Sequence, residues 1–219
     1  MNGEPRATLS GVKMGGECVV RNNVIFNFPA HQFEFVADST MNLQFDHNTL
    51  YQANTNATAT SALLYITDGG GTIPKSNFCR NNIFYDAGDP GNNCGVYAPP
   101  GILSMSNNLY YMPGESALGN DGTSEYFSLD EWVVVSEDKW SLDGNPLLES
   151  VVEGAENFSI TSLSPARDAG TFVVAIDMNG ESRSTVTPDL PSGGCGALGV
   201  EGLLLAFLLG RGRRLFRKS

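Results

Sequence analysis

The amino-acid sequence predicts an all-β protein in which short strands are arranged as stacked repeats. Glycine accounts for 25 of the 219 residues and charged residues for only 17%, which suits short strands and turns better than long helices. A polar corner ending in asparagine, followed by an aromatic-rich apolar triplet, occurs four times along the chain. Of the eight positions that lie five and three residues before the second asparagine, seven are apolar. Such repetition is typical of an array rather than of a single globular core.

The second asparagine of each corner marks the repeat. The marked residues are Asn23, Asn48, Asn82 and Asn108, at intervals of 25, 34 and 26 residues. Positions five and three residues before the mark are almost all apolar, and the position two residues before it is polar in every copy. This period of two is expected of a strand with one buried face. The β-branched and aromatic residues after the mark indicate a second strand beyond a sharp corner, and further apolar runs between the copies supply a third.

No segment between the copies has the dozen residues that a helical crossover between parallel strands needs. We therefore expect each strand to pair in parallel with its equivalent in the next repeat. Asparagine tolerates the left-handed backbone of a tight corner, and stacked amides can hydrogen-bond to one another. We interpret the four marked asparagines as a structural ladder, and we predict that the aromatic residues after them turn inward and stack as a column.

The four repeat segments resemble those of a known superfamily. Segments at all four marks are similar to the repeats of right-handed parallel β-helix proteins of the pectate-lyase-like superfamily: ECVVRNNVIFN, MNLQFDHNTLYQ, KSNFCRNNIFYD and GILSMSNNLYYM. Two later segments resemble the closing part of many bacterial surface β-helix proteins: FSLDEWVVVSEDKWSLDGNPLL and FSITSLSPARDAGT. The resemblance implies an all-β, right-handed parallel β-helix (solenoid) with a C-terminal cap and a short apolar and basic tail.

The marks divide the chain into parts. Residues 1–112 are expected to form the parallel β-helix rungs, and residues 113–191 a C-terminal capping segment, because an array must cover its last exposed strands. Trp132, Trp140 and Leu147 are our candidates for that cover.

Residues 192–219 form a tail with a short apolar stretch and a basic end. Fewer than the roughly 20 apolar residues of a spanning helix are present. The tail resembles the C-terminal sorting tails of exported bacterial surface proteins, which implies an extracellular or cell-surface location with membrane contact only through the tail. An amphipathic end helix, or a last strand with a basic end, is the alternative. Because the array begins abruptly and no signal-peptide pattern opens it, we expect this chain to be the C-terminal part of a longer product.

The charge and the cysteines restrict the partners. The net charge is −11, and five of the 13 basic residues lie in the last nine positions, so nucleic-acid binding is not expected. Cys18, Cys79, Cys94 and Cys195 show no zinc spacing, and no metal or cofactor is predicted, although calcium stays open without a motif. Cys79 and Cys94 could pair, but we favour Cys18 and Cys79 as small buried residues. We expect a monomer.

A column of polar residues stands two positions before the marks: Arg21, Asp46, Arg80 and Ser106, with Lys75 just upstream. The resemblance implies polysaccharide binding along the outward face of a parallel sheet, so Arg21, Asp46, Arg80 and Lys75 are candidates for a groove that binds anionic glycans. The alternative is an ion-pair column on a solvated face. No catalytic residue can be assigned, and whether the chain is an enzyme stays open.

Three functions are compatible with this pattern. We favour an exported, surface-associated protein that binds or processes polysaccharide and is not catalytic by itself. The alternatives are a lyase or hydrolase fragment that acts on acidic glycans, and a non-catalytic structural or adhesive spacer.

Overall fold

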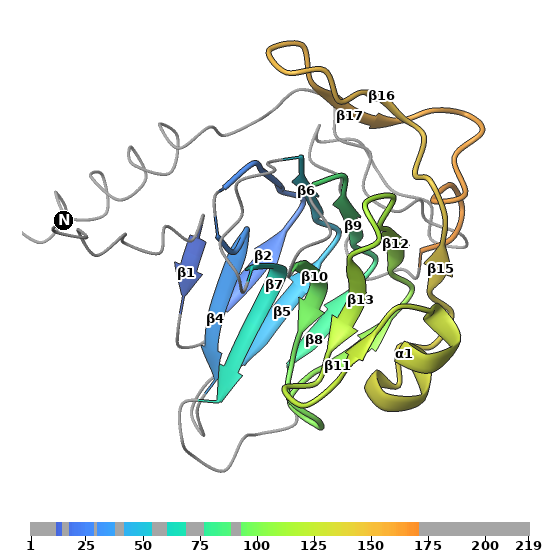
Figure 1. Cartoon of the computed structure of the whole chain (residues 1–219). Helices are drawn as coiled ribbons and strands as arrows, with labels where there is room; N and C mark the ends of the chain where they lie inside the picture. Colours follow the sequence, from blue (N-terminus) through green and yellow to red (C-terminus); the bar gives the residue numbers. More distant parts are fainter. Residues whose placement is uncertain are drawn as a thin grey trace, which may run out of the picture.

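The chain is built mainly from parallel β-sheets. The computed structural model describes residues 12–14, 18–28, 30–37, 42–53, 61–68, 77–88 and 93–170. Over these residues the chain forms three sheets of mostly parallel strands, a two-stranded hairpin and one helix (Figure 1). The prediction of a predominantly β chain is confirmed.

Sheet A has six strands within the described ranges, in the order β1-β4-β7-β10-β13-β14. Their bounds are Val12–Met14, Phe33–Ala37, Ser61–Asp68, Asn93–Tyr97, Ala117–Asn120 and Glu125–Tyr126. All neighbours pair in parallel except β14, which is antiparallel to β13.

Sheets B and C are parallel throughout the part of the chain that the structure describes. Sheet B has the order β11-β8-β5-β2, with bounds Ser104–Ser106, Phe78–Arg80, Leu43–Asp46 and Cys18–Arg21. Sheet C has the order β15-β12-β9-β6-β3, with bounds Leu142–Asp143, Leu109–Tyr111, Ile83–Asp86, Thr49–Gln52 and Val24–Phe26. The strands therefore follow one another from sheet to sheet along the chain.

Equivalent residues of successive repeats pair with each other. In sheet B, Arg21 pairs with Asp46, Asp46 with Arg80, and Arg80 with Ser106. From β1 to β10 each strand pairs with the strand three places later in the chain, and so does β12, whereas β11 has no such partner among the described residues. This arrangement is compatible with a β-helix-like solenoid, and it places each column of the sequence repeat along one line across a sheet.

One core cluster draws on all three sheets. Phe33 and Phe35 of sheet A, Leu43 and Phe45 of sheet B and Leu50 of sheet C are fully buried in it. The alternation read from the sequence is thus confirmed, with one polar exception. Buried Asn77 occupies an apolar position, where it accepts from the Leu43 N–H at 2.8 Å and donates to the Ile102 carbonyl at 3.1 Å, so its amide is satisfied.

The aromatic residues after the ladder form two columns, not one. Phe84 and Tyr110 point into the core and stack with ring centroids 5.2 Å apart. Tyr85 lies on the opposite face of sheet C, at 5.0 Å from Tyr51 and 4.9 Å from Tyr111. The prediction of a single inward column is therefore wrong for this second set, because successive strand residues point to opposite faces.

The outer column is covered by the chain that follows. The chain continues in a hairpin of β16 (Leu148–Ser150) and β17 (Asn157–Ile160). This hairpin places the ring centroid of Phe158 at 5.5 Å from that of Tyr51. Further along, Ala166 packs against Ile83 and Leu109. In Figure 1 the hairpin lies beside the sheet C strands β6 and β9. The later chain therefore covers the outer face of sheet C.

Parallel pairing extends beyond residue 112, where the sequence analysis placed the end of the rungs. Strand β13 pairs with β10, and β15 pairs with β12. Between them lies helix α1 (Leu129–Ser136), which composition did not predict. Ser128 caps it by accepting from the Glu131 N–H at 3.4 Å, and acidic residues occupy its first turn. A Ser-x-x-Glu capping pattern in the sequence was the available signal.

Trp132 closes the core at this end. It is 1% exposed and packs on the last parallel strand of sheet A, so closely that a Cβ on Gly119 would lie 2.4 Å from its ring. Its Nε1–H donates to the Tyr110 hydroxyl at 3.2 Å. Trp140, in contrast, is 75% exposed, and Leu147 is half-buried. Of the three residues expected to cover the end, Trp132 is the one that joins the core.

No helix among the described residues is long and apolar enough to cross a membrane. The tail at 192–219 lies outside them.

Candidate functional site

The polar column of sheet B forms an arginine–aspartate–arginine cluster. Arg80 donates from Nε to Asp46 Oδ1 at 2.9 Å and from Nη2 to Oδ2 at 3.1 Å. Arg21 donates from Nε to the same Oδ2 at 3.3 Å, and its Nη2 contacts the Gln44 side-chain oxygen. The two guanidiniums therefore share one carboxylate across three neighbouring strands.

Burial differs within this cluster. The Asp46 side chain is fully buried, whereas those of Arg21 and Arg80 are 32% and 24% exposed. A buried carboxylate bonded from both sides holds the two arginines in place, because leaving it unpaired would be costly. Arg80 uses Nε and Nη2 in this way, and about a quarter of its side chain remains exposed.

A second column on the same face runs beside the charged one. It consists of Val19, Gln44, Phe78 and Ser104, which lie two residues before the members of the first column. The Arg80 guanidinium carbon lies 4.8 Å from the Phe78 ring centroid, a cation–π contact. We call these two columns the sheet B face. It offers cationic donors, an aromatic ring and an amide side by side.

The cluster is suited to binding and not to proton abstraction. Arginine stays protonated in proteins and cannot act as a base at ordinary pH. Its remaining N–H groups can bind a carboxylate or a sulfate. Lys75, the fourth groove candidate, lies outside the described residues, so the structure places Arg21, Asp46 and Arg80 together but not Lys75.

Comparison with known proteins does not add to this geometry. No protein-family model, curated protein or solved structure matches the chain. The chemistry of the sheet B face is therefore argued from its own contacts and charges.

The four ladder asparagines lie in one hydrogen-bonded line. Their side-chain amides donate from Asn23 to Asn48 at 3.0 Å, from Asn48 to Asn82 at 3.1 Å and from Asn82 to Asn108 at 3.0 Å. Each of these three acceptor oxygens also receives the backbone N–H of the preceding asparagine. Every ladder amide donates its other hydrogen to a backbone carbonyl.

The strained corner falls one residue earlier than we inferred. The left-handed backbone belongs to the residue before each ladder asparagine, with φ of 57°, 55°, 58° and 55° at Asn22, His47, Asn81 and Asn107. This explains the double asparagine of three copies: the first turns the chain and the second bonds across repeats.

A buried aspartate, missed in the sequence, ends the ladder. Asp138 accepts from the Asn108 amide at 3.1 Å and from the Tyr110 hydroxyl at 2.6 Å, and Ser141 donates to it as well. The Ser141 hydroxyl also accepts the Asn108 N–H at 2.7 Å, as a further asparagine oxygen would. Its spacing could have identified it in the sequence, because Asp138 follows Asn108 by 30 residues and the earlier intervals between ladder residues are 25 to 34 residues.

Asp138 gives the fold a pH-dependent stability. Burial raises its pKa to about 6, against the lowering effect of hydrogen bonds from Ser141, Tyr110 and Asn108. The folded chain thus binds a proton that the unfolded chain releases near pH 4, and stability falls as pH rises through about 6. The difference between a pKa near 4 in the unfolded chain and about 6 in the folded chain corresponds in full to about 3 kcal/mol of stability.

We therefore expect the stability difference between the wild type and Asp138→Asn to change by about 2 kcal/mol between pH 4 and pH 7. The free energy of unfolding of the wild type should fall relative to that of the amide variant as pH rises, because the variant has no proton to release at this position. Urea unfolding of the full chain at both pH values measures this. A difference that does not vary with pH would show that Asp138 titrates alike in both states.

The cysteines could have served as metal ligands or as reactive groups. Cys18, Cys79 and Cys94 are free thiols, Cys79 and Cys94 are buried, and burial raises the pKa of each of the three. Cys195 lies outside the described residues. Among the residues that the structure describes, no group of three or more His, Cys, Asp or Glu side chains gathers as metal ligands.

Proposed function

We propose that the chain is an exported, surface-associated right-handed parallel β-helix protein of the pectate-lyase-like type, and that it binds acidic polysaccharide along the sheet B face. The observation that carries the proposal is the Arg21–Asp46–Arg80 cluster. It sets two partly exposed guanidiniums against one buried carboxylate in a chain whose net charge is −11. A locally cationic face on an acidic protein favours an anionic ligand.

The details of the face support a uronate-containing glycan. Guanidinium groups bind carboxylates through paired N–H donors. The Phe78 ring and the Gln44 amide lie next to these donors and can contact sugar rings and hydroxyls. Because Asp46 already fixes the arginines, little side-chain entropy is lost when a ligand binds. Binding without turnover by this chain is the function that we infer.

The cell-surface location is part of the proposal and is supported by the sequence of the tail and by the resemblance of the repeats. The competing function is a spacer that projects other domains from the cell. In that case the arginines serve only to hold adjacent strands together.

Affinity for oligogalacturonate tests the proposal. We expect the full chain to bind it, and Arg80→Ala to weaken binding by about tenfold or more, because a charge-assisted hydrogen bond is lost. Arg80→Lys, which keeps the charge beside Asp46 but lacks the planar fork, should weaken binding by a smaller factor. The matched control is Arg167→Ala, which removes an exposed arginine outside the sheet B face and should leave affinity unchanged.

Two results would count against this function. Equal effects of Arg80→Ala and Arg167→Ala would show that the glycan binds elsewhere. If a panel of acidic and neutral glycans shows no binding at all, the carbohydrate function is wrong and the spacer function replaces it.

A further inference from the structure

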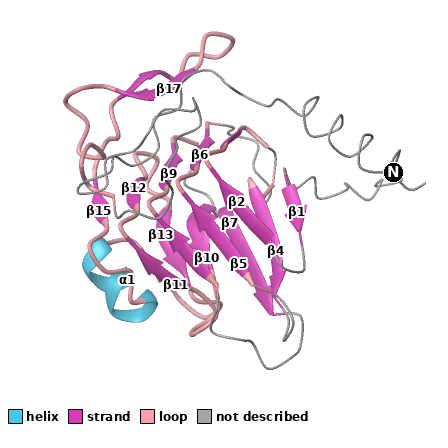
Figure 2. Ribbon diagram, turned by 180° about the vertical axis from the view of Figure 1, so that it is seen from behind, coloured by secondary structure: helices cyan, strands magenta, loops and turns pink. Residues whose placement is uncertain are grey.

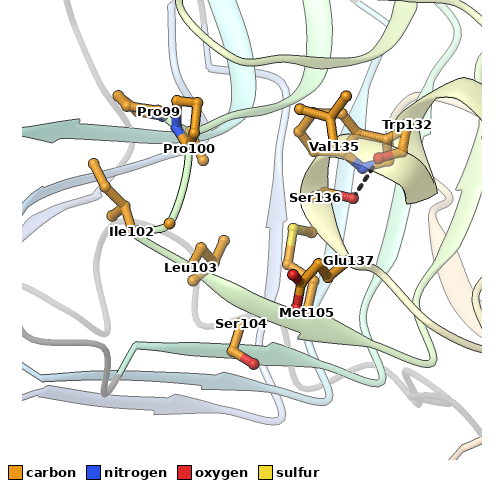
Figure 3. A pocket seen from close by; sticks show the side chains of 12 residues that line it. Pro99, Pro100, Ile102, Leu103, Ser104, Met105, Trp132, Val135, Ser136 and Glu137 are labelled. Atoms are coloured by element: carbon orange, nitrogen blue, oxygen red, sulfur yellow. Dashed lines mark hydrogen bonds between the residues drawn. The ribbon is translucent and has the colours of Figure 1, made fainter.

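A pocket of about 360 Å³ lies beside sheet B, between the connection that follows β10 and helix α1. Figure 3 shows Pro99 and Pro100 on one side, Trp132 and Val135 of the helix on the other, and the β11 strand below. Both the volume and the mixed lining are in the usual range for small-ligand sites.

The pocket lies at the end of sheet B where, among the described residues, no strand follows β11. Sheets A and C each continue past the fourth repeat with β13 and β15, whereas β11 is the last strand of sheet B in the described chain. Helix α1 occupies this stretch of the sequence, and the chain returns to the edge only at Lys139, which bridges to Ser106. In Figure 2 the helix lies next to the β11 end of the sheets.

The edge of β11 therefore presents backbone groups to the pocket. Ser104 donates its N–H to the Asn77 carbonyl at 2.9 Å, and the Ser106 carbonyl accepts from Asn81 at 3.2 Å, both toward β8. Because alternate residues of a parallel strand bond to opposite sides, the N–H and C=O of Met105 face away from β8. The parallel bridge between Ser106 and Lys139 directs the Lys139 N–H to the Met105 carbonyl. The Met105 N–H is therefore the edge donor on the side of the pocket, which Met105 lines.

The other lining residues are divided by polarity. Ile102, Leu103 and Val135 supply apolar surface. Ser104 and Glu137 are exposed and stand at the rim, whereas the Ser136 hydroxyl is occupied by its bond to the Trp132 carbonyl at 2.7 Å. A ligand that fits would combine an amide or hydroxyl for the strand edge, a small apolar group, and hydroxyls for the rim.

We propose that this β11 pocket binds the acetamido group of an N-acetylhexosamine unit. The acetamido carbonyl accepts the Met105 N–H, its methyl group contacts Leu103 and Val135, and a ring hydroxyl bonds to Glu137. The inference rests on the proposed function, and it narrows the ligand to an acidic glycan that also contains N-acetylhexosamine.

Two observations favour a sugar over an added peptide strand. The pocket is bounded at one end by the turn at Pro99–Ile102 and at the other by Lys139 on Ser106, so a strand could not run on past β11. The pocket also adjoins the sheet B face, since Ser104 pairs with Phe78 and Ser106 with Arg80. The paired residues of β11 and β8 are about one strand spacing, or about 4.8 Å, apart. This spacing is close to the length of one sugar unit.

The test compares two oligosaccharides of equal length. Hyaluronan fragments alternate glucuronate with N-acetylglucosamine, and oligogalacturonate has the carboxylates without the acetamido groups. We expect the full chain to bind hyaluronan fragments at least about tenfold more tightly. Val135→Trp, which fills the pocket, should remove that preference but leave oligogalacturonate binding unchanged. Val134→Trp is the matched control, because Val134 is the neighbouring helix residue and is 80% exposed.

Glu137→Ala provides a second variant that does not alter the core, since Glu137 is exposed at the rim and lies outside the sheet B face. It should also abolish the preference. Equal affinity for the two oligosaccharides in the wild type would overturn the acetamido site while leaving the proposed function standing. Absence of all glycan binding would remove both. Displacement of bound hyaluronan from the wild type by a free Val-Thr-Val-Thr peptide, but not by N-acetylglucosamine, would overturn the sugar assignment in favour of strand addition.

Discussion

Trp132→Ala should destabilise the chain by about 3–5 kcal/mol, the largest loss that we expect from a single substitution. Its indole is 1% exposed, packs on Gly119 and donates to Tyr110. Truncation leaves a cavity at the end of the core and deprives the Tyr110 hydroxyl of a donor beside the buried Asp138 carboxylate. Equilibrium unfolding in urea measures the change.

Trp140→Ala is the matched control for this experiment. Trp140 is 75% exposed and lies eight positions further along the same segment. Its removal should alter stability by no more than about 0.5 kcal/mol. Similar losses from the two variants would contradict the assignment of Trp132 as the residue that closes the core.

Asn82→Leu should cost at least about 3 kcal/mol, because it interrupts the ladder at a fully buried position. The backbone and side-chain N–H groups of Asn48 lose their shared acceptor, and the Phe45 carbonyl loses its donor. Leucine has a similar volume, so the loss reports on hydrogen bonding more than on packing. Thermal and urea unfolding of the full chain both measure it.

The comparison is Asn23→Leu at the other end of the line. Asn23 is only half-buried and donates to Asn48 without serving as acceptor to an earlier ladder residue among those described. We expect a loss of about 1 kcal/mol. If Asn23→Leu were as costly as Asn82→Leu, the effect would come from the corner conformation and not from the ladder.

The repeated part of the fold was predictable because each repeat carries its own local signal. Alternation before Asn48 and Asn82 identified the buried positions Phe45 and Cys79 correctly. The region after residue 112 lacked such a signal. There the pairing of β13 and β15 depends on contacts between distant residues, and Gly119 lies directly against the Trp132 ring.

The site was predictable only in outline. Equal spacing from the ladder was enough to bring Arg21, Asp46 and Arg80 into one column. The complete burial of Asp46 was not foreseeable, because it results from two arginines that fold over one carboxylate. The β11 pocket had no sequence signal either, since it arises where α1 replaces a strand that the repeat would have supplied.

The direction of the ladder bears on how the chain is made. Each ladder amide donates one of its hydrogens to a residue synthesised later, from Asn23 through Asn108 to Asp138. As the chain leaves the ribosome, the newest asparagine is always the one whose donors await an acceptor. We therefore expect nascent chains released before Ser141 to keep a frayed trailing end, and the array to become resistant to protease only when that last acceptor has emerged.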